Sequence, residues 1–175
     1  MLINALGATV GISRGLHLID SFTSSVSVES AGIPFAVGIL ESIGFEVFLV
    51  SHDGLQMLGV DAVLSKGGKQ YLADFKIEKR YTGNLFLELW SNRNPFRPKV
   101  GWAVDSMCDY VVYCFLDVRK VFVLHKESML KFLESNWKRY TEVTQRAYAQ
   151  VNVTTGVIVP VEDLASCIVF YRETE

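Results

Sequence analysis

The sequence predicts an α/β domain in which helices flank a central mixed β-sheet. The predicted elements follow the order helix, run of strands, helix, strands, which is typical of one sheet covered by helices. The chain has 175 residues, and half of them are apolar, which is enough to bury a core. We therefore expect a single domain over residues 1–175.

The N-terminal half predicts a helix followed by a strand. In the stretch SAGIPFAVGILESIGF, Phe35, Ile39 and Ile43 recur at helical spacing. Pro34 suits the first turn of this helix, and Gly44 suits its end. A strand is expected over residues 45–50.

A β-hairpin is expected over residues 59–77. Gly67-Gly68 favours a two-residue turn, which pairs Asp61 directly with Asp74. Side chains alternate along a strand, so Asp74 and Lys76 share a face with Asp61, with the opposed Cβ atoms about 5 Å apart. A longer turn would shift this register.

The rest of the chain predicts further strands and one long helix. Residues 84–90 read as a strand, and residues 91–102, with two prolines, as a loop. The remaining expectations are strands at 109–116 and 120–125, a helix over 126–150 and short strands within 156–171.

Charge is distributed unevenly along the chain. The net charge is −2, which argues against a generally basic nucleic-acid binder, yet residues 66–102 carry eight basic and three acidic residues. Such a segment could follow a polyanion such as DNA, or it could be a solvated loop that happens to be basic. Charge alone leaves both readings open.

Other classes of protein find little support. The three cysteines form no CxxC pair, and with the three histidines they match no zinc spacing. We expect reduced thiols and a cytoplasmic location, in a bacterial host if the source is viral. No apolar stretch is long enough to span a membrane, and no basic region precedes the apolar start, so neither a membrane span nor a signal peptide is expected.

The predicted hairpin places two carboxylates where they repel each other. A divalent cation would offset that repulsion, and Mg²⁺ favours oxygen ligands from one or two carboxylates. Lys76 could orient water or stabilise charge on a phosphate beside such an ion. The alternative is an Asp–Lys–Asp ion cluster on an exposed sheet face.

These residues resemble the PD-(D/E)XK nuclease superfamily, in which an acidic residue on one strand precedes an acidic-x-Lys motif on the next. The matching stretches are GVD at 59–61 and ADFK at 73–76. Downstream, GNLFLELWSN, GW and CDYVVYCF are similar to phage and Holliday-junction-resolvase-like members. The resemblance covers about residues 30–135 and implies a restriction-endonuclease-like core.

The resemblance also implies roles for individual residues. Asp61, Asp74 and the carbonyl of Phe75 would be metal ligands, and Lys76 the catalytic lysine. Glu88 would assist at the site, or be a paired carboxylate without a catalytic role. The match departs from the pattern at Val60, where the motif has proline. It is also poor for a first-helix glutamate, for which Glu29 fits better than Glu41, so a second metal site stays open.

Basic and polar residues near the motif are candidates for DNA contacts, because such side chains commonly bind phosphates. Phe96 and Trp102 could stack on an unpaired base or wedge into a junction, or pack within the protein. The candidates for nucleic-acid binding are Lys79, Arg80, Tyr81, Asn84, Arg93, Arg97 and Lys99.

We therefore expect a Mg²⁺-dependent deoxyribonuclease, with Mn²⁺ as a substitute, that acts as an endonuclease on branched or structured DNA. Cutting two strands favours a homodimer with one site per strand. The alternatives are an exonuclease or restriction-type nuclease with the same site, and a non-catalytic nucleic-acid-binding module on the same fold. A small-molecule-binding domain is weaker, because no Gly-rich phosphate loop follows a strand.

Overall fold

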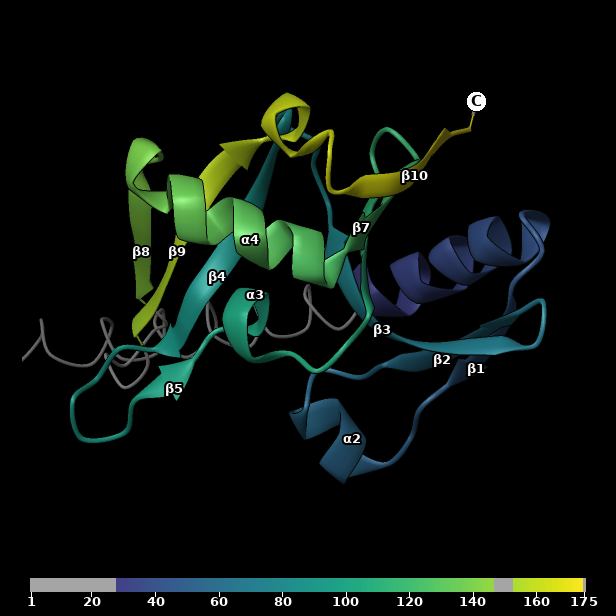
Figure 1. The fold of residues 1–175 in the computed structure, drawn as a ribbon, viewed down its shortest axis with the longest axis horizontal. Coiled ribbons are helices and arrows are strands. Elements are labelled where there is room, and N and C mark those ends of the chain that lie inside the picture. The colour runs from purple at the N-terminus through teal and green to yellow at the C-terminus, as the bar shows by residue number, and fades with distance from the viewer. Residues whose placement is uncertain (1–27, 147–152, 175) are drawn as a thin grey trace, which may run out of the picture.

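The computed structural model describes residues 28–146 and 153–174, which form a mixed α/β fold (Figure 1). Its central six-stranded sheet has the order β1-β2-β3-β6-β7-β10. The pair β3–β6 is parallel and the other neighbours are antiparallel, so the predicted mixed sheet is confirmed. The strands are β1 (Glu46–Leu49), β2 (Ala62–Lys66), β3 (Lys69–Glu78), β6 (Tyr110–Phe115), β7 (Lys120–His125) and β10 (Ile168–Glu173).

The hairpin of β2 and β3 has the predicted register. Gly67 and Gly68 have φ values of 58° and 74°, which a type I′ turn requires at both central positions. The ladder pairs Lys66 with Lys69 at the turn and Ala62 with Ala73 at its far end. The turn chemistry thus fixes which side chains of the two strands share a face.

A helix over residues 28–42 covers one face of this sheet. Ala36 and Leu40 are fully buried in a core cluster with Leu64 and Phe75 of the hairpin. Gly44, with φ 87°, follows the helix as predicted. The predicted start is wrong, because the helix is already formed at residue 28 and Pro34 lies within it. Packing of the apolar face against the sheet supports a turn that lacks one backbone donor.

A second, antiparallel sheet stands beside the first and has the order β5-β4-β9-β8. Leu85 and Leu87 of its longest strand pack with Val111 and Phe115 of the central sheet and with Met129 of α4, in one buried cluster. The strands are β4 (Asn84–Asn92), β5 (Lys99–Val100), β8 (Glu142–Arg146) and β9 (Val153–Pro160), and the longest described helix after residue 42 is α4 (Lys126–Asn136).

One predicted helix and several short elements differ between the sequence prediction and the structure. The helix expected over 126–150 ends with α4 and a 3-10 turn, η1 (Trp137–Arg139), and residues 142–146 form β8; residues 147–150 lie outside the described part. Thr141, Val143 and Thr144 are β-branched, which favours a strand paired with β9. The short helices α2 (Asp53–Met57) and α3 (Trp102–Asp105) and the strand β5 were not predicted.

Two general expectations concern thiols and membranes. Cys108, Cys114 and Cys167 are buried and free, as expected of reduced thiols. Within the described residues, no helix has both the length and the apolar character that crossing a membrane requires.

Candidate active site

A polar cleft of about 320 Å³ lies between the β2–β3 hairpin and the strands β4 and β5. Gln56, Met57 and Gly59 form one wall, and Trp102 and Ser106 of the α3 region close it from a second side. The cleft is rich in charged side chains. These are Asp61, Asp74, Lys76, Glu88, Lys99 and Asp105.

Asp74 is the most deeply buried carboxylate of this cleft. Its side chain is 1% exposed, and Oδ1 lies 2.5 Å from Lys76 Nζ. Oδ2 is also buried and has no hydrogen-bond partner among the residues that the structure describes. Burial raises the pKa of Asp74 to about 6; the Lys76 ammonium lowers it, and the Asp61 carboxylate raises it further. Asp74 is therefore a carboxylate with one compensated oxygen and one that lacks a partner.

Asp61 lies where the β2–β3 ladder ends. Its backbone N donates to Ala73 O (2.8 Å), and its Oδ2 accepts from the backbone N of Phe75 (2.8 Å). The predicted register therefore holds up to the pair Ala62–Ala73, and at the next position both the backbone N and the side chain of Asp61 bind β3. Both carboxylates line the same cleft, as the predicted shared face requires.

Lys76 occupies the predicted place beside Asp74. Its side chain is 26% exposed, so the ammonium is held by Asp74 and still reaches the cleft. The Nζ atom lies 5.1 Å from the ring centroid of Trp102, close enough for a cation–π contact. Trp102 in turn packs on Tyr113, with the ring centroids 6.3 Å apart. Of the two roles considered for Trp102, the structure shows packing, here against the cleft lysine.

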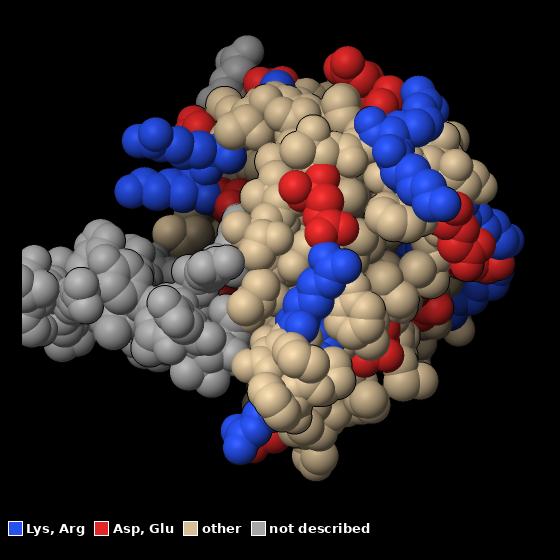
Figure 2. All heavy atoms as spheres, turned by 90° about the vertical axis from the view of Figure 1, so that its left-hand side faces the viewer, with Lys and Arg blue, Asp and Glu red and all other residues tan. Residues whose placement is uncertain are grey.

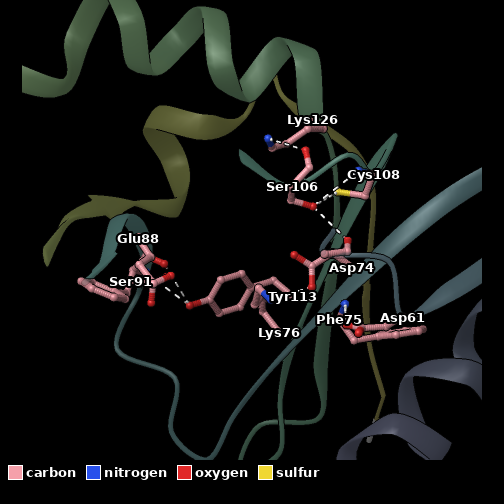
Figure 3. A network of polar contacts seen from close by, with 12 residues as sticks. Asp61, Asp74, Phe75, Lys76, Glu88, Ser91, Ser106, Cys108, Tyr113 and Lys126 are labelled. Carbon is pink, nitrogen blue, oxygen red and sulfur yellow. Dashed lines mark hydrogen bonds and ion pairs between the residues drawn. The ribbon is translucent and has the colours of Figure 1, made fainter. Parts of the chain in front are cut away.

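Glu88 faces this group from the second sheet. It accepts a hydrogen bond from Ser91 Oγ on the same strand, and both residues line the cleft. Figure 3 shows Glu88 and Ser91 on one side and Asp61, Asp74 and Lys76 on the other, with the ring of Tyr113 between them. Glu88 is thus brought to the site by the packing of the second sheet against the first, and not by the hairpin.

Lys126 and Ser106 support the site and were not predicted. Lys126 is 4% exposed, and its Nζ donates to the carbonyls of Val104 (3.2 Å) and Ser106 (3.1 Å). Burial lowers the pKa of Lys126. Ser106 Oγ donates to Gly59 O (2.9 Å), which ties the loop before Asp61 to the segment after α3 (Figure 3). These partners are 20 and 47 residues apart in sequence, so no local spacing indicates them.

Glu29 lies on the helix over residues 28–42 and lines a neighbouring cleft of about 410 Å³. Asp61, Phe75 and Lys76 line this cleft too, so it adjoins the first one across Asp61 and Lys76. A helix that starts with Pro34 in its first turn would leave Glu29 before the helix, but Glu29 is part of it. Glu41 lies at the opposite end of the same helix and lines neither of these clefts.

The predicted nucleic-acid residues separate into two groups. Lys99 lines the cleft, whereas Lys79, Arg80, Tyr81 and Asn84 lie beyond the end of the motif strand and are not among its lining residues. Tyr81 packs edge-on against Phe115, with ring centroids 5.0 Å apart, which is a core role. Figure 2 shows the face on the left of Figure 1, where described basic and acidic side chains alternate and leave uncharged surface between them.

Two further basic candidates lie near β5. Arg93 Nη1 forms an ion pair with Glu142 Oε1 (2.5 Å), which joins the end of β4 to β8. Arg97 is exposed in the loop between β4 and β5 and forms no ion pair with any described residue. Of the two, Arg97 is therefore the one whose charge is available to a ligand.

The carboxylate oxygens of the cleft suit a hard cation that takes only some of its coordinating ligands from the protein. Among the described residues, no three His, Cys, Asp or Glu side chains gather closely enough to form a metal cluster. The unpartnered Oδ2 of buried Asp74 and the nearby carboxylate of Asp61 nevertheless provide oxygen ligands of the kind that Mg²⁺ binds alongside water and phosphate. The residues present fit such an ion.

Comparisons with known proteins give one structural likeness. No family model matches the sequence, and no curated protein matches it. A solved structure of a bacterial homing endonuclease is similar over 62% of this chain and 73% of its own, with 17% sequence identity and a TM-score of 0.46.

Proposed function

We propose that this protein is a metal-dependent deoxyribonuclease that hydrolyses DNA phosphodiester bonds at the cleft around Asp74. The observation that carries the proposal is the state of Asp74, which is buried, paired with Lys76 through one oxygen and unpartnered at the other. Ionising a carboxylate in such a buried place costs free energy unless a cation also interacts with its second oxygen. The resemblance of the Asp61, Asp74 and Lys76 pattern to PD-(D/E)XK nucleases agrees with this chemistry.

Asp61, Asp74 and the carbonyl of Phe75 would hold Mg²⁺ or Mn²⁺, which when bound polarises the phosphate and promotes ionisation of water. The hydrogen bond from Phe75 N orients the Asp61 carboxylate against β3 before any ligand arrives. Glu29, on the neighbouring cleft, is the candidate for a second cation.

Lys76 would act on the reacting phosphate. The Asp74 carboxylate and the Trp102 ring hold its ammonium at the cleft, where it can donate hydrogen bonds to a phosphate oxygen or to the attacking water. Glu88 would accept a proton or orient water from the opposite wall, with Ser91 fixing one of its oxygens. The two sheets would thus each supply a part of the site.

The finer proposal is an endonuclease on branched or structured DNA that works as a homodimer. An apolar groove of about 310 Å³ beside α4, with Trp137 and Val104 partly exposed in it, is the surface that we propose for the dimer. Sedimentation of the wild type and of Trp137→Ala at several protein concentrations tests the dimer. If the groove is the dimer interface, Trp137→Ala should be monomeric where the wild type is dimeric. An exonuclease and a restriction-type nuclease are the alternatives with the same site.

The nuclease itself is tested by cleavage of a labelled four-way junction, a linear duplex and a single strand with Mg²⁺, Mn²⁺ or EDTA. Metal-dependent cutting that is lost in Lys76→Ala and Asp74→Asn would support the proposal. Lys69→Ala is the matched control, because Lys69 is an exposed lysine of the same strand at the hairpin turn. DNA binding without cutting, equal in all variants, would instead indicate a non-catalytic binding module.

A further inference from the structure

An exposed phenylalanine lies in the loop that leads to the cleft wall. Phe96 is 91% exposed and lies in the loop of residues 93–98, between β4 and β5. This loop projects beyond the second sheet in Figure 1. Lys99 directly follows the loop and lines the cleft, so the loop continues from the cleft wall.

The loop is held in shape by side-chain hydrogen bonds to its own backbone. Asn92 is 8% exposed, and its Oδ1 accepts from Asn94 N (3.0 Å) and from Val153 N (3.2 Å). Asn94 Oδ1 accepts from Phe96 N (3.0 Å). Pro95 and Pro98 restrict the backbone on either side of Phe96. The apolar ring is therefore presented to solvent by an ordered turn, which lowers the entropy cost of binding a ligand there.

The charges around the cleft are unfavourable for binding duplex DNA through its phosphates. Four carboxylates line the cleft against two lysines, and binding of a duplex depends mainly on cationic contacts to many phosphates. Arg97 and Lys99 add positive charge, but only at the end of the cleft next to the loop of residues 93–98. Across the cleft, Met57 lines the wall and is 79% exposed. Apolar groups thus stand on both sides of a polar centre.

We propose that Phe96 stacks on an unpaired base, and that the substrate is DNA with a single-stranded segment next to the bond that is cut. Arg97 and Lys99 would contact its phosphates, and Met57 would contact a base from the opposite wall. Aromatic side chains bind any base through its π-face, and this stacking tolerates sequence variation. The inference rests on the proposed function and narrows its substrate to DNA with unpaired nucleotides at the site.

The test is binding in EDTA of a fluorescent single strand, a blunt duplex, and a duplex with a single-stranded flap, measured by anisotropy. We expect Phe96→Ala to bind the single strand and the flap about tenfold more weakly and the blunt duplex unchanged. Phe96→Tyr keeps a ring and should bind like the wild type. Phe48→Ala removes another exposed phenylalanine, 55% exposed on β1, and should have no effect.

Salt dependence separates stacking from charge. Arg97→Ala should reduce the slope of log affinity for the single strand against log salt by about 0.7, whereas Phe96→Ala should leave the slope unchanged. Equal losses by Phe96→Ala on all three DNAs, or no loss on any, would overturn the inference.

Cleavage with Mg²⁺ then distinguishes this inference from the proposed function. Cutting that depends on Lys76 but prefers the blunt duplex, unchanged in Phe96→Ala, would overturn the inference and leave the nuclease standing. If the single strand binds in a way that depends on Phe96 but no DNA is cut, the loop is supported as a base-stacking site and the proposed nuclease activity is wrong.

Discussion

Asp61 Oδ2 accepts a hydrogen bond from the backbone N of Phe75 at 2.8 Å, at the position where the β2–β3 ladder has just ended. The backbone N of Asp61 still donates to Ala73 O, and the Asp61 side chain satisfies the donor that directly follows Asp74. The contact holds the Asp61 carboxylate beside the cleft and explains how two acidic residues come to lie together in a hairpin. It also makes the site depend on the register that Gly67 and Gly68 impose.

Lys76→Ala should reduce DNA cleavage by about 100- to 1,000-fold, because it removes the donor that would stabilise charge on the phosphate. It also leaves the buried Asp74 carboxylate without its ion-pair partner, so the metal-free protein should be less stable at neutral pH. Single-turnover rates and thermal unfolding in EDTA measure the two effects. A variant that cuts as fast as Lys69→Ala would exclude a catalytic role for Lys76.

Asp74→Asn should stabilise the metal-free protein at neutral pH. The folded-state pKa of Asp74 is about 6, raised from 3.8, so the folded protein keeps a proton between these values that the unfolded chain has lost. Stability of the wild type therefore falls as pH rises from about 4 to about 6, by about 3 kcal/mol, and stays lower above that range. Asparagine carries no charge at any pH and avoids this loss.

Urea unfolding in EDTA at about pH 4 and about pH 7.5 measures this difference. The advantage of Asp74→Asn over the wild type should be small at the acidic pH and full at the higher one. Glu46→Gln serves as the control, because Glu46 is an exposed carboxylate on β1. An advantage that does not grow with pH would show that Asp74 is already compensated in the folded protein.

The hairpin was predictable because its determinants are local. Two glycines set the turn, and alternation then places Asp61, Asp74 and Lys76 on one side within 16 residues of chain. Glu88 was predicted on the following strand, but its position across the cleft depends on how a second sheet packs against the first. The contacts of Lys126 with Val104 and Ser106 follow from that packing alone, so sequence spacing gives no signal for them.

The helix that the sequence predicts over residues 126–150 is an example in which the local sequence pattern is misleading. Apolar residues at helical spacing correctly indicate α4, but the same spacing continues by chance beyond Asn136. Val143 and Thr144 there pair with Gly156 and Thr155 of β9 as part of β8. Strand pairing with a distant segment outweighs local helical spacing, and a single sequence does not contain that pairing.

Mn²⁺ or Mg²⁺ should raise the melting temperature of the wild type, because an ion that binds only the folded state stabilises it by mass action. At 100 times the dissociation constant the gain is about 2.7 kcal/mol, a shift of several degrees for a chain of this size. Asp61→Asn and Asp74→Asn should lose most of the shift. Glu29→Gln tests a second ion: an unchanged shift would leave Asp61 and Asp74 as the binding pair.

Gly101→Ala should destabilise the fold by about 1–3 kcal/mol and also reduce cleavage. A Cβ at Gly101 would lie 2.3 Å from Glu88 O and 2.6 Å from Glu88 C, and these backbone atoms cannot rotate away as a side chain would. Gly101 N also donates to Leu89 O (2.8 Å), so its close approach fixes α3 against β4. Moving α3 outward would displace Trp102 from Lys76 and widen the cleft beside Glu88.

Gly38→Ala is the matched control for this prediction. Gly38 lies in the helix over residues 28–42, and a Cβ there meets no atom within 4 Å. Alanine should therefore stabilise the protein at that position by about 0.5–1 kcal/mol, through its higher helix propensity. Denaturant unfolding of both variants gives the comparison. If Gly101→Ala were as stable as the wild type and cut DNA equally well, close packing of α3 on β4 would not be what positions Trp102 over Lys76.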